Sequence, residues 1–167
     1  MSNIGIIYGS DTGHTEDVVN RLADVLGTNN IDLIEVSNTS VEQISSYDKL
    51  IFATSTWGDG DLQSDWEDFE SNLDEVDFSN KTVALLGLGD QEGYEDTFCN
   101  GMSLLYDKIK ACHLVGQTST EGYNFEESTS VVDGKFLGLV IDEDNQDDLT
   151  DERLENWAEQ IKGDFGI

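Results

Sequence analysis

Between Ser10 and Thr15 the chain reads SDTGHT, a run that supplies three hydroxyl groups around a glycine but no lysine or arginine. It follows the apolar run IGIIY at 4–8 and precedes a stretch with the apolar spacing of a helix. The amino end of a helix presents free N–H groups and a partial positive charge, which together suit an anion. Neutral donors could therefore hold a phosphate here. Taken alone, the motif is equally explained by Thr12 acting only as a helix cap.

Two nucleotide-binding motifs can be excluded from the glycine spacing. A Walker A loop has four residues between its glycines and then a lysine, whereas Gly9 and Gly13 enclose three residues and are followed by His14. The run GLGDQEG at 87–93 has its third glycine one place late for a dinucleotide fingerprint, and no helix is expected to open within it.

Two further loops each carry an aromatic residue in acidic, glycine-rich surroundings. Trp57 lies in STWGDGDLQSDW, after the third apolar run of the chain, and Tyr94 lies in GLGDQEGYEDTF, after the fourth. Loops that follow parallel strands meet at the carboxyl edge of an open sheet, where ligands bind. A flat ligand with a phosphate tail could lie between the two aromatic rings, and FMN has that shape.

The remaining pattern indicates how these loops are positioned. Short apolar runs at 4–8, 31–36, 49–54 and 82–89 are typical of strands that are buried on both faces. Helical spacing occurs between and after them, and SVEQ at 40 and SDWE at 64 predict capping boxes. The helical positions are Val18, Leu22 and Leu26; Trp66, Phe69 and Leu73; Phe98, Met102, Leu105 and Ile109; and Leu154, Trp157, Ala158 and Ile161. Alternating strands and helices predict an α/β fold, a doubly wound three-layer sandwich.

One strand of this sheet is interrupted. The apolar runs at 114–118 and 136–142 are separated by a polar stretch at 119–135, which we interpret as a loop that splits the fifth strand. Residues 1–167 are the length of one domain, and we expect a single FMN-binding domain.

The composition restricts the partners. Eight Lys and Arg residues stand against 36 Asp and Glu, so the net charge is −28. This charge argues against binding nucleic acid or inserting into an anionic membrane, and it favours a basic protein partner, although solubility alone would also account for it. Cys99 and Cys112 are too few for an iron–sulfur cluster or a structural zinc site, and we expect no metal site. The chain shows neither a signal peptide nor a membrane span, so a cytoplasmic location is expected.

Taken together in their order and spacing, SDTGHT, STWGDG with LQSDW, GLGDQEGY and GLVIDEDNQDDLTDERL resemble the flavodoxin family, and the loop at 119–135 resembles that of its long-chain type. The resemblance implies a five-stranded parallel sheet in order 2-1-3-4-5 and one non-covalently bound FMN. It also implies a low-potential one-electron carrier that substitutes for ferredoxin, with no catalytic residues. The implied partners are basic redox proteins such as a ferredoxin/flavodoxin-NADP reductase, photosystem I or another oxidoreductase, and a monomer is expected.

The same resemblance assigns roles to individual residues. The phosphate is expected to be held by the hydroxyls and amides of the first loop, namely Ser10, Asp11, Thr12, Gly13, His14 and Thr15. Thr56 and Asp144 are expected near the ribityl chain, Trp57 and Tyr94 on the two faces of the isoalloxazine, and Gly89, Asp90 and Cys99 along its pyrimidine side. Gly58 and Asp59 are expected beside N5, where the Gly58 peptide can turn its carbonyl toward the ring on reduction. Two of these residues have a simpler interpretation: an acid in DEDNQDD can be merely solvated, and a lone cysteine can pack as a small apolar side chain.

Acidic residues are expected to surround the flavin, and their charge should drive its second reduction to low potential. They are Asp59, Asp61, Asp65, Asp90, Glu92, Glu95 and Asp96. The loop at 119–135 is expected to lie apart from the cofactor loops and to serve partner contact.

Two other functions share this fold. A receiver domain would need an acidic pair after the first strand and an aspartate after the third, but Tyr8-Gly9-Ser10 and Ala53-Thr54-Ser55-Thr56 stand there. An FMN-dependent quinone reductase is the alternative that the motifs leave open. Such an enzyme would need a nicotinamide pocket, and no basic group for a dinucleotide phosphate is evident.

Overall fold

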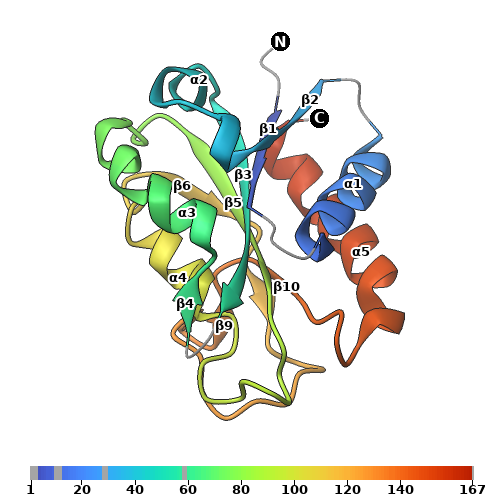
Figure 1. Cartoon of the computed structure of the whole chain (residues 1–167). Helices are drawn as coiled ribbons and strands as arrows, with labels where there is room; N and C mark the ends of the chain where they lie inside the picture. The colour runs from blue at the N-terminus through green and yellow to red at the C-terminus, as the bar shows by residue number, and fades with distance from the viewer. Residues whose placement is uncertain (1–3, 10–12, 28–29, 58–59, 167) are drawn as a thin grey trace.

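The computed structural model describes residues 4–9, 13–27, 30–57 and 60–166, with the side chain of Trp57 outside the description. Within these residues, parallel strands form the centre of the molecule (Figure 1). They lie side by side in the order β2 (Ile31–Glu35), β1 (Ile4–Tyr8), β3 (Lys49–Trp57) and β5 (Thr82–Leu88). The expected strands at these positions are confirmed, and β3 is longer than its apolar run because it continues through the polar residues 55 and 56.

The fifth strand is split, as the sequence predicted. β6 (His113–Val115) pairs with the first half of β5 and β10 (Leu139–Ile141) with the second half, both in parallel. The interruption is wider than the expected 119–135, since it runs over 116–138. It contains a small antiparallel sheet in the order β7 (Thr118–Ser119), β9 (Lys135–Phe136) and β8 (Val131–Val132). The order 2-1-3-4-5 and the doubly wound α/β fold are therefore confirmed.

Helices cover both faces of the sheet, as Figure 1 shows. α1 (His14–Leu26) and α5 (Thr150–Phe165) share one buried cluster with the side chains of β1, β3 and β5. The opposite face packs against α2 (Val41–Ser45), α3 (Ser64–Phe69) and α4 (Asn100–Tyr106). The 3-10 turns are η1 (Val36–Asn38), η2 (Glu70–Glu75) and η3 (Asp147–Leu149). No helix in the described part of the chain is both long and apolar enough to cross a membrane.

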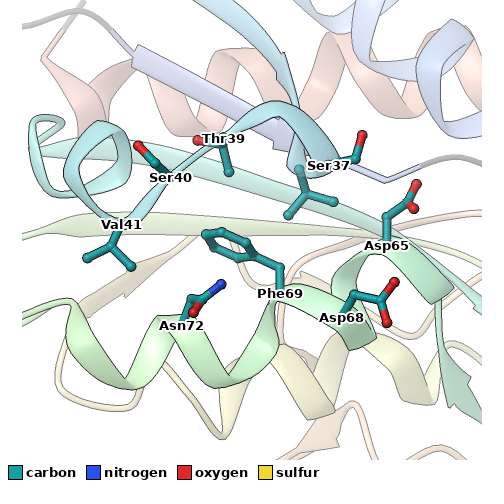
Figure 2. A pocket seen from close by; sticks show the side chains of 9 residues that line it. Ser37, Thr39, Ser40, Val41, Asp65, Asp68, Phe69 and Asn72 are labelled. Atoms are coloured by element: carbon teal, nitrogen blue, oxygen red, sulfur yellow. The ribbon is translucent and has the colours of Figure 1, made fainter.

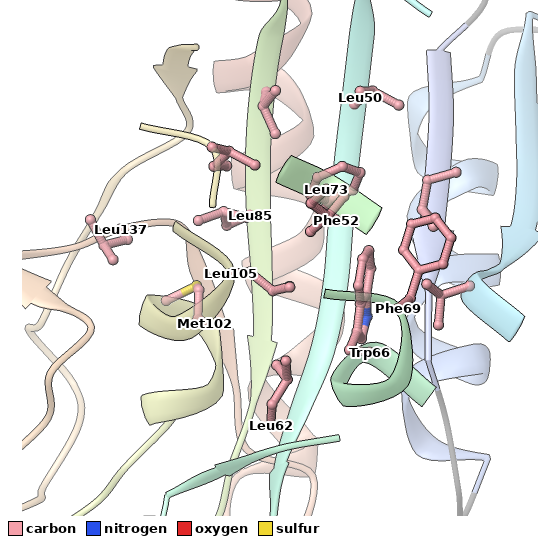
Figure 3. Close-up of a cluster of buried hydrophobic side chains, with 14 of the residues drawn as sticks. Leu50, Phe52, Leu62, Trp66, Phe69, Leu73, Leu85, Met102, Leu105 and Leu137 are labelled. Carbon is pink, nitrogen blue, oxygen red and sulfur yellow. The ribbon is translucent and has the colours of Figure 1, made fainter. Parts of the chain in front are cut away.

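The core on the α3 and α4 face combines leucine and methionine side chains with aromatic residues, among them Phe52, Trp66 and Phe69 (Figure 3). Phe52 of β3 and Trp66 of α3 lie with ring centroids 5.1 Å apart. The indole Nε1 of Trp66 donates a hydrogen bond of 2.8 Å to the carbonyl of Ala53, so the buried ring has its polar atom satisfied. This bond attaches the first turn of α3 to the middle of β3.

The predicted helix starts are partly right. Ser40 caps α2 by accepting a hydrogen bond from the Gln43 amide, at 3.1 Å. The predicted cap at Ser64 is wrong, because the cap of α3 is Gln63, whose side chain accepts from the Trp66 amide. α4 is shorter than the apolar spacing suggested, since Phe98 and Ile109 are buried outside its two ends.

The junction between the long insertion and β10 gives a stability prediction. A Cβ on Gly138 would lie 1.9 Å from the carbonyl oxygen of Leu85 in β5. Gly138→Ala should therefore displace β10 and lower the free energy of unfolding by about 1–3 kcal/mol or more. Gly163→Ala is the matched control, because Gly163 lies in α5 with open space around its Cβ position, and it should raise stability by about 0.5–1 kcal/mol. Urea unfolding followed by circular dichroism measures both, and equal stabilities would contradict this packing.

Candidate cofactor-binding site

The loops that carry the candidate residues all leave the same edge of the sheet. They follow β1, β3, β5 and β10, which are mutually parallel. The segments are 9–13, 57–63, 89–99 and 142–146, and none of them contains a lysine or arginine. The structure thus places the sequence-predicted loops at one edge and supplies the contacts between them.

The first loop leads directly into α1. Its N-cap is Gly13, with a φ of 88° that a glycine adopts without the strain a Cβ would add. Thr15 is buried in the first turn and His14 is exposed. Ser10, Asp11 and Thr12 lie outside the described residues, so their expected roles stay predictions. The described part fits an anion, because a thirteen-residue helix begins at a glycine whose backbone a ligand can approach closely.

Gln63, which the sequence analysis gave no role, lies against the first loop. A Cβ on Gly9 would lie 2.0 Å from the Gln63 Oε1. The Gly9 amide also donates to the Ala53 carbonyl at 3.3 Å. Gly9 therefore lies between β3 and the start of α3, and a side chain there would displace the Gln63 amide that caps α3.

The second loop folds back on β3. Thr56 and Trp57 pair with β4 (Asp61–Leu62) in antiparallel fashion, and Gly58 and Asp59 between them lie outside the described residues. The expectations for Gly58, Asp59 and the Trp57 ring therefore stay predictions. The Thr56 hydroxyl oxygen accepts a hydrogen bond of 2.9 Å from the Gly101 amide of α4. Its O–H can still be donated, so the expected contact with a ribityl oxygen is compatible with this bond.

The third loop is a tight turn that presents Tyr94. The Asp90 carboxylate accepts from the Gly93 amide at 2.7 Å and from the Glu92 amide at 3.1 Å, and the Asp90 carbonyl accepts from the Tyr94 amide. Tyr94 is 45% exposed, so its ring is accessible to a ligand. The bond from the Gly93 amide, followed by those from Asn145 and Glu92, lowers the pKa of Asp90.

Cys99 is fully buried, behind Gly89. A Cβ on Gly89 would lie 2.7 Å from the Cys99 Sγ. Burial, with the charge of Asp142 as a smaller cause, raises the pKa of the thiol well above its usual range. Cys99 was expected either beside the flavin or packed as a small apolar side chain. In this structure its thiol is packed as a small apolar side chain.

Asp144 is exposed and lies in an electrostatically crowded turn. Partial burial raises its pKa, and the charges of Asp90 and Asp142 add to this, while His14 acts in the opposite sense. Its neighbour Glu143 accepts a 3.0 Å hydrogen bond from Arg21 of α1. The fourth loop is therefore attached to the middle of α1.

The expectation that the long loop lies apart from the cofactor loops is wrong. The amides of Glu126 and Glu127 both donate to the Glu95 carbonyl at 2.9 Å, and the Phe98 amide donates to the Glu127 carbonyl. The Phe98 ring also packs on Phe125, with centroids 5.1 Å apart. The insertion is folded onto the loop that presents Tyr94, through backbone hydrogen bonds that residue types do not reveal.

A groove of about 420 Å³ lies between the segment 36–41, which follows β2, and α3 (Figure 2). Its lining combines the Phe69 ring with the carboxylates of Asp65 and Asp68, which Figure 2 shows at one end. None of the residues expected to hold the cofactor lines it. The groove shares only Asp65 with the acidic residues expected around the flavin.

Fold and site together define a doubly wound α/β protein whose candidate binding loops, which contain no lysine or arginine, lie where the parallel strands end. A family model described as Flavodoxin matches residues 6–157. The chain is 50% identical to a flavodoxin of Helicobacter pylori over 165 residues, with 99% of each chain covered, and 45% identical to a Nostoc flavodoxin over 166 residues, with 98% of each covered. This protein belongs to the flavodoxin family.

Two solved structures of a flavodoxin share this fold. The chain superposes on Fusobacterium nucleatum flavodoxin bound to flavin mononucleotide with a TM-score of 0.93, at 36% identity, covering 98% of this chain and 99% of the other. The K13G mutant of that protein, also bound to flavin mononucleotide, gives a TM-score of 0.94 at 37% identity.

The opposite pKa shifts of Asp90 and Asp144 predict opposite pH dependences in the cofactor-free protein. Asp90 has a lowered pKa, so its charge stabilises the fold above about pH 4 and this contribution is lost as the pH falls through the folded-state pKa. Asp144 has a raised pKa, so its charge costs stability once the pH rises above about 4. Asp90→Asn should therefore be less stable than wild type at pH 7, and Asp144→Asn more stable.

Both differences should shrink toward zero as the pH falls below about 4. Urea unfolding at pH 3 to 7 measures them, at low protein concentration because the isoelectric point is near 4.1. Shifts of the same sign in the two variants at pH 7 would contradict the assigned environments.

Proposed function

We propose that this chain is a long-chain flavodoxin, a single cytoplasmic domain that binds one FMN without a covalent bond and acts as a monomer. Its function is that of the family, the transfer of single electrons between redox proteins. The observation that carries the proposal is that the amino end of α1, with Gly13 at its cap, and the exposed ring of Tyr94 lie at one edge of the sheet. A phosphate at one and a flat ring at the other match the two ends of FMN.

The chain's own residues would hold the cofactor as follows. The amides and hydroxyls from Ser10 to Thr15 would bind the phosphate, and Thr56 and Asp144 the ribityl chain. Trp57 and Tyr94 would enclose the ring, Gly58 and Asp59 would lie beside N5, and the backbone of Gly89, Asp90 and Cys99 would follow the pyrimidine side. FMN supplies reversible one-electron chemistry when bound, and these residues bind and orient it and exclude water.

The absence of cations from these loops determines how strongly the site resists added negative charge. One carboxylate about 10 Å from the ring, at an effective dielectric of about 20, raises the energy of an added electron by about 1.7 kcal/mol before screening. That energy is about 70 mV for one electron. Asp61, Glu92 and Glu95 are exposed around this edge, so several such contributions would favour a low potential for the second electron.

We expect purified protein to contain FMN rather than FAD, because the binding motif ends at a monophosphate and the four loops offer no basic group for a second phosphate. Expression with riboflavin supplied, release of the cofactor by acid and chromatography against FMN, FAD and riboflavin standards measure this. Recovery of FAD, or of no flavin, would refute the proposal. NADPH-dependent reduction of a quinone without an added reductase would instead favour a quinone reductase.

The partners we propose are basic redox proteins, of which a ferredoxin/flavodoxin-NADP reductase and photosystem I are examples. Attraction between a chain of charge −28 and a basic surface is screened within about 8 Å at physiological ionic strength, so association should slow steeply as salt is added. Replacing Asp61, Asp65 and Glu92 by their amides should weaken this salt dependence, as stopped-flow mixing with such a reductase would show.

The matched control neutralises three exposed carboxylates of α5, namely Glu152, Glu155 and Asp164, which changes the net charge equally. If the acidic residues near the site direct docking, the control should retain most of the wild-type salt dependence. Equal effects in the two triple variants would assign the acidity to net charge alone.

A further inference from the structure

Asp142 is a buried carboxylate to which the sequence analysis gave no role. It directly follows β10 and is 0% exposed, although it begins the acidic run DEDNQDD. A buried carboxylate is tolerated when hydrogen bonds replace its hydration. The donors around Asp142 therefore show which parts of the chain its charge holds in place.

Five N–H donors surround this carboxylate. Oδ1 accepts from the amides of Asp144 at 3.1 Å and Asn145 at 3.0 Å. Oδ2 accepts from the Gln91 amide at 3.1 Å, the Gln91 Nε2 at 2.7 Å and the Asn145 Nδ2 at 2.9 Å. Bonds to an ionised acceptor are stronger than neutral ones, so this cluster binds the turn after β5 firmly to the turn after β10.

Gln91 extends the attachment to a third segment. Its Oε1 accepts a 2.6 Å hydrogen bond from the amide of Asn124, in the long insertion. Asn145 Nδ2 also donates to the Asp90 carboxylate at 2.7 Å. The turn at 90–94 is thus fixed from the side of β10 and from the insertion.

The fixed turn is the one that carries Tyr94. The Tyr94 amide donates to the Asp90 carbonyl at 2.9 Å, while the side chain is exposed. Few apolar contacts hold an exposed ring, so its position depends on the backbone beneath it. A binding site whose parts are in place beforehand loses less conformational entropy on binding.

We propose that Asp142 is a positioning residue of the flavin site: its buried carboxylate holds the 90–94 turn, and with it Tyr94, ready for the isoalloxazine ring before the cofactor binds. This inference depends on the proposed function. It gives Asp142 no contact with FMN and no part in the phosphate site.

Asp142→Asn in the full-length protein tests the proposal. The asparagine amide would place N–H groups opposite the donors of one oxygen, so at least two of the five bonds are lost. In the cofactor-free variant, amide hydrogen exchange over 89–98 should become tenfold faster or more, with β1 and β3 unchanged. The dissociation constants for FMN and for riboflavin should both rise about tenfold or more, by the same factor, because riboflavin has the ring but no phosphate.

Two controls separate positioning from other effects. Thr15→Val alters a buried residue in the first turn of α1 and should weaken FMN binding while leaving riboflavin binding unchanged. Tyr47→Phe removes a 2.6 Å hydrogen bond to Asp32, near the start of β3 and far from the loops, and should lower stability without changing either dissociation constant. If Asp142→Asn does not fold, Gln91→Ala repeats the test, because it removes the Nε2 donor and the Oε1 acceptor while keeping the carboxylate.

Unchanged exchange over 89–98, unchanged binding of both flavins, or weakening confined to FMN would each overturn the inference. If the wild-type protein binds FMN and Asp142→Asn behaves in the same way, only the positioning role is refuted. Wild-type protein that binds neither flavin refutes the proposed function and, with it, this inference.

Discussion

The parallel pairing of β5 with β3 on one side and with β10 on the other is the constraint on which the rest of the site depends. Parallel strands finish at a common edge, so the loops after β1, β3, β5 and β10 meet there whatever their own sequences. The Gly89 amide continues this pairing one residue past β5 by donating to the Ile141 carbonyl at 3.1 Å. The turns at 90–94 and 142–146 therefore start side by side, and Asp142 can reach Gln91.

These loops contain no lysine or arginine, so they must bind an anion with neutral hydrogen-bond donors. Backbone amides are the main donors that the described part of these loops uses: Gly93 and Glu92 bond to Asp90, and Asp144 and Asn145 bond to Asp142. Dipoles of this kind stabilise negative charge without adding a full positive charge of their own. Such surroundings can bind a phosphate while the electrostatic potential at a neighbouring ring stays negative. A negative electrostatic potential disfavours an added electron, as a low-potential electron carrier requires.

Much of the fold could be predicted because burial leaves a clear pattern. The runs at 4–8 and 82–89 are apolar on both faces of a sheet, and the spacing of Leu154, Trp157 and Ile161 matches one face of α5. The cap of α3 could not be predicted, since Ser64 is the usual type of residue for a cap and Gln63 takes the position by packing against Gly9. That choice depends on a tertiary contact, which local sequence does not encode.

The sequence indicated which loops form the site, but not the hydrogen bonds between them. Asp142 looked like one more solvated acid in DEDNQDD, because burial of a carboxylate depends on donors from Gln91, 51 residues earlier in the chain. The contact of the insertion with the Tyr94 loop was missed for the same reason: it is made by backbone amides such as those of Asn124 and Glu127, and every residue except proline has one.

The split of the fifth strand is what brings the insertion to the site. β6 ends at Val115 beside the middle of β5, where Gly116 turns the chain with a φ of 82° and its carbonyl accepts the Trp157 Nε1 at 2.8 Å. The chain returns to β5 only at Leu139. The intervening residues must therefore cross over the outer side of α4 and the 89–98 loop, where Phe125 and Phe136 pack on Phe98. Apolar packing on Phe98 and the hydrogen bonds to Asp142 thus hold this loop at two places, while residues 92–96 between them are exposed and include the Tyr94 ring.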